Sequence, residues 1–182
     1  LLRHVPTQDV ARRYFKRKPT MFKIYFISGL LISSITACGQ SNNNDKNSDL
    51  AFYQATSKWF SAWELVSQVI YKIETVRPVE FVFFDDTYVY STSAVTIKNG
   101  ISVVGNNLMN LKFQWRKELH NDTLTLPDHS VIPVNLLSFA AEIPAENKSF
   151  FVMPLPGFWQ QAGVSGKELG LENLITGVFI HE

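Results

Sequence analysis

The chain of 182 residues has a single cysteine, few charged side chains and no apolar run long enough to cross a bilayer. One cysteine excludes a disulfide within the chain. The apolar stretch 24–35 would form a helix of about 18 Å, against a hydrocarbon core of about 30 Å. Charged residues make up 18% of the chain and the formal net charge is +1. The 46% hydrophobic content nevertheless excludes general disorder and predicts one domain with a real core.

The small net charge is the sum of two segments whose net charges have opposite signs. Residues 1–37 carry seven basic side chains against one acidic residue, Asp9, a net charge of +6. Residues 38–182 carry 10 basic and 15 acidic side chains, a net charge of −5. Such asymmetry is typical of a targeting segment ahead of a mature domain. Because the mature domain is acidic, we expect no nucleic acid among its partners.

The basic segment, residues 1–37, contains the elements of a lipoprotein signal. A short basic start at residues 21–23 precedes the apolar stretch, as in a secretory signal peptide. Ile35-Thr36-Ala37-Cys38 then resembles the bacterial lipobox, whose cysteine is diacylated and becomes the first residue of the mature protein. The resemblance implies a signal peptide over 21–37 and a membrane anchor on Cys38 in the bacterial cell envelope. Gly39 after the cysteine resembles lipoproteins that are sorted to the outer membrane, which implies its periplasmic or surface face. The alternative is a buried helix in which Cys38 is a small apolar residue.

The remaining boundaries follow from composition. Residues 1–20 precede a plausible start at Met21 and are interpreted as an upstream extension of the reading frame; a cytoplasmic basic arm is the alternative. Residues 38–49 are polar and rich in turn formers, which predicts a flexible tether. Residues 50–182 are expected to form the folded domain, incomplete at its C-terminal end.

The pattern of the mature region predicts an α+β fold with a long N-terminal helix, an antiparallel strand meander and a C-terminal helix. Asp49 can cap a helix from Leu50 to about Val76, which Arg77-Pro78 ends. A hairpin is expected at the Asn99-Gly100 turn. The expected strands cover residues 79–90, 94–98, 101–104, 112–119, 123–126, 131–134, 139–143 and 150–153.

Two groups of titratable residues do not have the spacing of a site. Asp85 and Asp86 are adjacent, so on a strand their carboxylates would point to opposite faces. We therefore expect a turn or bulge that carries solvated charges. His120 and His129 have no ligand-type spacing to each other or to another histidine or cysteine, which predicts surface loop histidines.

The last residues combine an apolar helix face with two polar groups. The apolar positions recur at helical spacing: Leu171, Leu174, Ile175, Val178 and Phe179. On the same wheel Glu182 falls in the middle of this face, and His181 falls at its edge. Burial of a carboxylate costs free energy unless the group is paired or has a functional role. This end of the helix is therefore the candidate site.

Val178-Phe179-Ile180-His181-Glu182 resembles the first half of the zincin metallopeptidase motif, His-Glu-x-x-His after an apolar approach. The resemblance implies that His181 is the first zinc ligand and that Glu182 is the general base. The second histidine would come three residues after Glu182, and no third ligand can be identified. It also implies an edge strand that holds extended peptide or protein substrate, for which 150–153 is the expected segment.

Two functions remain open for the chain. The resemblance implies the N-terminal portion of a lipid-anchored cell-envelope zinc metallopeptidase, inactive over these 182 residues because one ligand cannot make a zinc site. In the alternative, the helix ends with His181 and Glu182 hydrated. The chain is then a complete, non-catalytic envelope lipoprotein that acts as a binding or interaction module. Whether the protein is an enzyme is therefore undecided by the sequence.

Overall fold

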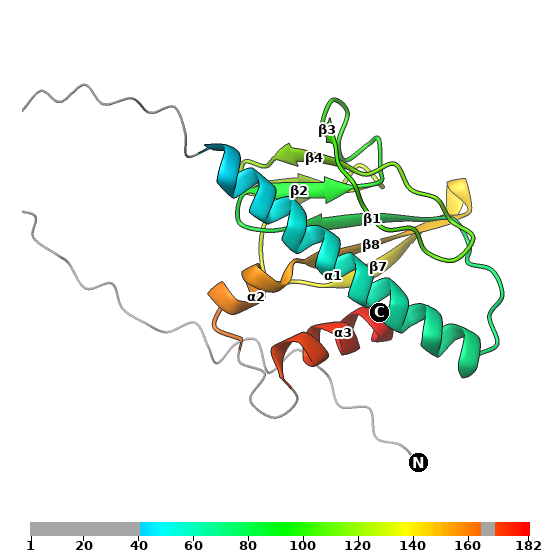
Figure 1. Ribbon diagram of the computed structural model, residues 1–182. Helices are drawn as coiled ribbons and strands as arrows, with labels where there is room; N and C mark the ends of the chain where they lie inside the picture. Colours follow the sequence, from blue (N-terminus) through cyan, green and yellow to red (C-terminus); the bar gives the residue numbers. More distant parts are fainter. Residues whose placement is uncertain (1–40, 165–169) are drawn as a thin grey trace, which may run out of the picture. The chain divides into compact units, whose positions relative to one another are not determined.

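A computed structural model describes residues 41–164 and 170–182 (Figure 1). All of them belong to the second of the two units into which the chain divides, residues 38–182. The expected extension 1–20, the expected signal peptide 21–37 and the expected lipidation site Cys38 lie outside the described residues and stay predictions. Within the described part, no helix has both the length and the apolar composition to cross a membrane.

The described residues form an α+β fold, which confirms the predicted class. The helices are α1 (Ser41–Val69), a 3₁₀ helix (Pro144–Glu146), α2 (Pro156–Gln161) and α3 (Leu171–His181). The strands are β1 (Val79–Phe84), β2 (Tyr88–Ser91), β3 (Ile101–Ser102), β4 (Arg116–Leu119), β5 (Thr123–Thr125), β6 (Val131–Pro133), β7 (Phe139–Ile143) and β8 (Lys148–Pro154).

The main sheet is mixed, whereas an antiparallel meander was expected. Its strand order is β3-β4-β2-β1-β8-β7, and β5 and β6 form a separate two-stranded sheet. β1 and β8 run parallel, and the other neighbours in the main sheet are antiparallel. The chain therefore leaves β1 toward one edge of the sheet and returns to the other side of β1 as β8.

The central strands are buried on both faces, which explains their continuous apolar runs. Phe81 and Phe83 of β1 contribute to one core together with residues of α1 and α3. Val82 and Phe84, which point the other way, contribute to a second core with residues of β5 and β8. In Figure 1, α1 crosses one face of the sheet, and α3 lies beside α1.

The N-terminal helix begins and ends earlier than the pattern predicts. α1 starts at Ser41, so residues 41–49 of the expected tether are helical. It ends at Val69, and Lys72 has the left-handed φ of 57° that stops a helix. Ile70 consequently lies outside the helix and is exposed rather than buried on its face.

The hairpin predicted at Asn99-Gly100 does not form. Residues 94–98 contain no strand; residues 94–96 form a turn, and the Ile97 N–H donates to the Ser93 carbonyl at 3.1 Å. β3 instead pairs with β4. A Cβ on Gly100 would lie 2.5 Å from the Lys117 carbonyl oxygen, so this glycine permits a close approach to β4 rather than a two-residue hairpin turn.

Candidate functional site

The C-terminal end of α3 is held against the sheet by one aromatic anchor. Ile175 and Phe179 are the buried residues of α3. The Phe179 ring lies 5.1 Å from the ring of Phe151 in β8, and 5.6 Å and 5.8 Å from those of Trp59 and Phe60 in α1. Because these contacts come from both layers, Phe179 fixes where the following residues lie.

His181 and Glu182 end this helix with different exposure. The His181 side chain is 86% exposed and the Glu182 side chain 35% exposed. His181 Nδ1 and Glu182 Oε1 are 4.0 Å apart, and the Glu182 N–H donates to the Val178 carbonyl at 3.1 Å. Glu182 thus lies on the face predicted by the helical wheel, but its carboxylate is not enclosed there.

Glu182 borders a hollow of about 190 Å³ between the sheet, α1 and α3. Arg77 and Glu182 are the charged residues on its wall, and we call this space the apolar hollow because the rest of its wall is mainly apolar. Its aromatic and aliphatic wall includes Trp63, Val76, Phe81, Leu108, Phe151 and Phe179. Ala140 of β7 and Ser149 of β8 complete the side next to the sheet edge.

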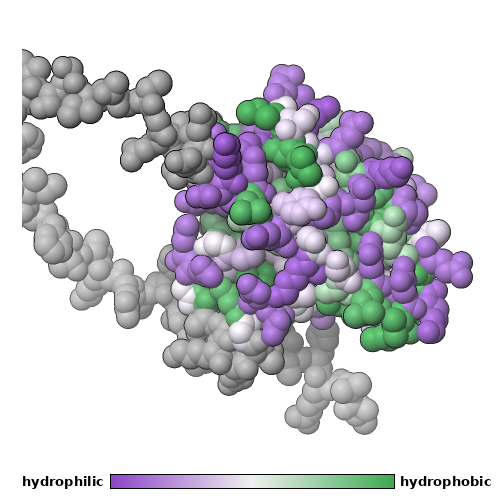
Figure 2. All heavy atoms as spheres, in the orientation of Figure 1, coloured by the Kyte–Doolittle hydropathy of each residue, from purple (hydrophilic) through white to green (hydrophobic). Residues whose placement is uncertain are grey.

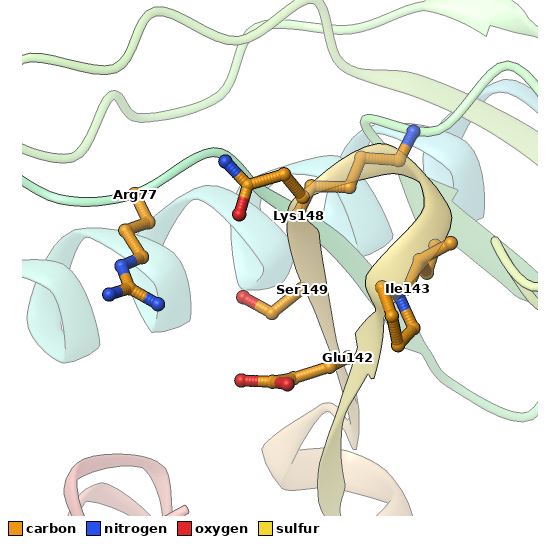
Figure 3. A pocket seen from close by; sticks show the side chains of 7 residues that line it. Arg77, Glu142, Ile143, Lys148 and Ser149 are labelled. Atoms are coloured by element: carbon orange, nitrogen blue, oxygen red, sulfur yellow. The ribbon is translucent and has the colours of Figure 1, made fainter.

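A smaller polar hollow of about 70 Å³ adjoins it at the β7–β8 turn (Figure 3). Arg77 and Ser149 line both hollows, and Glu142 lines the polar one. Figure 3 shows the side chains of Arg77, Ser149 and Glu142 directed into a common space, while Lys148 points away from it. The Lys148 ammonium ion pairs with Glu146 at 2.6 Å and with Glu80, and these contacts raise its pKa, the hydrogen bond to Glu146 most.

The prediction of which strand forms the sheet edge is wrong by one strand. Residues 150–153 belong to β8, which lies between β1 and β7. The edge of the sheet next to the apolar hollow is β7, and it runs antiparallel to β8. The sequence pattern could not distinguish them, because alternation and apolar runs define a strand but not its place in a sheet.

A second polar group, which the sequence did not suggest, fixes the N-terminal part of α1. The Lys117 side chain of β4 is only 6% exposed, and its ammonium lies 2.7 Å from Asp49 Oδ1 and 3.4 Å from Asp45 Oδ1. The Tyr88 hydroxyl donates to Asp45, and the Tyr90 hydroxyl donates to Asp49 at 3.3 Å. The signal was present, since Asp45 and Asp49 are four apart on one helix face, but the helix was expected to start at Leu50.

The pKa shifts in this group favour a charged Asp45 carboxylate and neutral Tyr88 and Tyr90 hydroxyls. The hydrogen bond from Tyr88 lowers the pKa of Asp45, and the same bond, followed by burial, raises the pKa of Tyr88 to about 12. Burial is the main cause that raises the pKa of Tyr90. With a buried ammonium between two carboxylates, the group is a clamp between α1 and the sheet.

The remaining titratable residues have structural positions. Asp85 ends β1 in a turn and accepts hydrogen bonds from the N–H groups of Thr87 and Tyr88, so the predicted turn is confirmed. His129 is exposed with a φ of 69° at the tip of the β5–β6 hairpin, as expected. His120 is half-buried, which differs from the expected surface position, because its Nε2 contacts the Asp85 carbonyl oxygen at 3.0 Å.

The described residues do not by themselves fit a zinc ion. No group of three His, Cys, Asp or Glu side chains within residues 41–164 and 170–182 could hold a metal. His181 is exposed, and the ion pair that it forms within the described residues is with Glu182, at 4.0 Å. A zinc site at this helix therefore requires ligands from outside the described residues, and zinc stays a prediction.

Comparisons with known proteins return nothing for this chain: no family model, no curated protein and no solved structure matches it.

Proposed function

We propose that the chain is the N-terminal portion of a lipid-anchored zinc metallopeptidase of the bacterial cell envelope. In this proposal His181 is a metal ligand, Glu182 is the proton acceptor, and the substrate is a peptide or protein. The remaining ligands come from outside residues 1–182, so these residues alone bind no zinc tightly and hydrolyse nothing.

The observation that carries the proposal is the arrangement at the end of α3. A histidine and a glutamate adjoin each other at the end of a helix whose apolar face packs on the sheet, and His181 is open to a further partner. Glu182 lies on the wall of the apolar hollow. A general base needs this position, within reach of both substrate and water.

The antiparallel edge strand β7 also supports the proposal. Ala140 of β7, which is an edge strand of the main sheet within residues 41–164 and 170–182, lines the same hollow as Glu182. Strand addition at a free edge fixes an extended peptide by backbone hydrogen bonds, whatever its side chains. A peptide bond presented along β7 would thus pass the end of α3.

The lipid anchor remains part of the proposal. α1 begins at Ser41, three Cα steps after Cys38, which span about 11 Å when extended. If Cys38 is acylated, the folded domain lies close to the membrane surface. Its substrates are then envelope peptides or proteins that reach this surface.

The reading frame beyond codon 182 gives the first test. The proposal predicts a histidine three positions after Glu182; a stop codon or another residue there contradicts it. The longer protein should hydrolyse a quenched fluorescent peptide library in the presence of zinc. Glu182→Gln should lose this activity by at least 10²-fold, whereas Glu172→Gln, an exposed glutamate of the same helix that pairs with Lys58, should retain it. Equal activity of wild type and Glu182→Gln would refute the role of Glu182.

A further inference from the structure

The exposed surface of α1 carries no acidic side chain over residues 45–69, the part of the helix whose side chains the structure describes. Asp45 and Asp49 are half-buried in the clamp with Lys117. Glu64 is half-buried as well, and it accepts a hydrogen bond of 2.6 Å from a backbone N–H of the β3–β4 loop. The helix therefore directs its acidic residues toward the sheet and the loops, and away from solvent.

The exposed charges along this helix are basic. Lys46 and Lys58 are exposed in α1, and the exposed Lys72 follows its end. Lys58 pairs with Glu172 of α3 at 2.6 Å. Because residues 38–182 have a net charge of −5, a helix surface with basic and no acidic side chains is unlike the domain as a whole. Such a surface attracts a partner with negative charges.

Large apolar side chains are exposed at the C-terminal end of the same helix (Figure 2). They are between 57% and 68% exposed, and we call them the α1-end patch: Leu65, Val69, Ile70 and Tyr71. Lys72 follows with a left-handed φ of 57°, so the chain turns directly after the patch. The next charged residues, Glu74 and Arg77, are exposed and have opposite charges. Aliphatic side chains beside a tyrosine and a lysine are typical of a membrane–water interface, where the ring and the ammonium reach the polar layer.

We infer that α1 docks on an anionic lipid bilayer, with the α1-end patch inserted among the headgroups and the exposed lysines facing lipid phosphates. The basic and apolar groups are spread along a helix of 29 residues, about 43 Å, and a bilayer is a flat surface that contacts all of them at once. The inference goes beyond the proposed function and rests on it for one point, the orientation of the helix. A lipid on Cys38 would hold the other end of α1, so that the helix lies along the surface.

The direct test places one environment-sensitive dye on the full chain. Cys38→Ser removes the single cysteine, and Ile70→Cys or Val131→Cys then takes the dye. Val131 is the matched control, since it is 63% exposed in the β5–β6 sheet, which packs on the second core. On vesicles of phosphatidylethanolamine and phosphatidylglycerol, the dye at position 70 should shift to shorter wavelength and be quenched by brominated lipid, and the dye at position 131 should do neither. The apolar stretch 24–35 can hold either protein on the vesicles, so the position of the dye decides. A dye at position 70 that stays in water on the vesicle-bound chain overturns the inference.

Serine variants locate the contact, with the dye now on Leu65→Cys. Ile70→Ser together with Tyr71→Ser should raise the lipid concentration needed for the shift at least about tenfold, because binding at a membrane surface scales with the apolar area that is buried. Leu119→Ser together with Val131→Ser is the matched control, since both residues are 63% exposed and lie in strands; it should keep the shift. Circular dichroism checks that both proteins fold. A folded Ile70→Ser, Tyr71→Ser protein that shifts like the wild type contradicts the inference.

Two further outcomes would overturn the inference. An equal response on vesicles of phosphatidylcholine alone would contradict an anionic surface. A shift at position 70 that grows with protein concentration in the absence of vesicles would mean that a second copy of the chain covers the patch. If the dye enters the bilayer but the longer protein holds no zinc, the proposed function fails and the docking surface stands. If zinc and hydrolysis are found while the dye stays in water, the reverse holds.

Discussion

Replacing Phe179 by alanine should destabilise the domain and release the end of α3. The side chain is 5% exposed and stands among the rings of Trp59, Phe60 and Phe151, which belong to both layers of one core. Truncation of a buried phenylalanine costs about 3–5 kcal/mol because it removes apolar contacts and leaves a cavity. Contacts on several sides limit collapse of the cavity, so we expect a loss of about 4 kcal/mol.

Urea unfolding followed by tryptophan fluorescence and circular dichroism measures this loss as a lower midpoint at unchanged slope. A loss of about 4 kcal/mol lowers the Tm by roughly 10–20 °C for a domain of this size. Ile180→Val, a half-buried neighbour on α3, is the control and should cost less than about 1.5 kcal/mol. If Phe179→Ala costs no more than Ile180→Val, Phe179 does not anchor the helix and the placement of His181 is wrong.

Three further changes test other parts of the account. Gly105→Ala should destabilise by about 1–3 kcal/mol in urea unfolding, because the new Cβ would lie 2.3 Å from the Trp115 ring; an unchanged midpoint would refute this packing. Asp45 has a lowered pKa, chiefly through its hydrogen bond from Tyr88, so its stabilisation is present above about pH 4 and is lost as the pH falls through the lower folded pKa. Asp45→Asn should therefore weaken the acid-side loss of stability in a pH series, and an identical pH profile would contradict the clamp. Cys38→Ser should abolish palmitate labelling in growing bacteria, whereas equal labelling of wild type and variant would exclude the lipid anchor.

Local patterns predicted the elements better than their arrangement. The apolar spacing of α3 and the run of β-forming residues from Val79 are both local signals. They indicate which residues are buried, whatever part of the chain those residues pack against. The parallel pairing of β1 with β8 depends on residues about 70 positions apart, which no local pattern encodes. The expected edge strand was wrong for this reason.

The start of α1 shows tertiary contacts overriding composition. Residues 41–49 are rich in asparagine, serine and aspartate, which favour turns in isolation. Asp45 and Asp49 nevertheless pair with the buried ammonium of Lys117, a residue about 70 positions later. Propensity is a weak prior, and a long-range ion pair of this kind extends the helix beyond the predicted cap.

The candidate site was predictable only in part. The helical wheel placed Glu182 on the face that carries Phe179, and the structure has it on the wall of the hollow with Phe179. The 35% exposure of Glu182 and the presence of Arg77 could not be predicted, because they depend on where α1 ends and on which strand forms the edge.

Apolar surface also remains open over the C-terminal end of α1 (Figure 2), where Leu65, Val69, Ile70 and Tyr71 are exposed.

The zinc content of the protein expressed from the reading frame beyond codon 182 tests the central claim most directly. Metal analysis after gel filtration should find one zinc per chain in the wild type and in Glu182→Gln, because the base is not a ligand. The same protein with His181→Ala should bind zinc at least tenfold more weakly or not at all. No zinc in the wild type, or the same tightly bound zinc in His181→Ala as in the wild type, would contradict the assignment of His181 as a metal ligand.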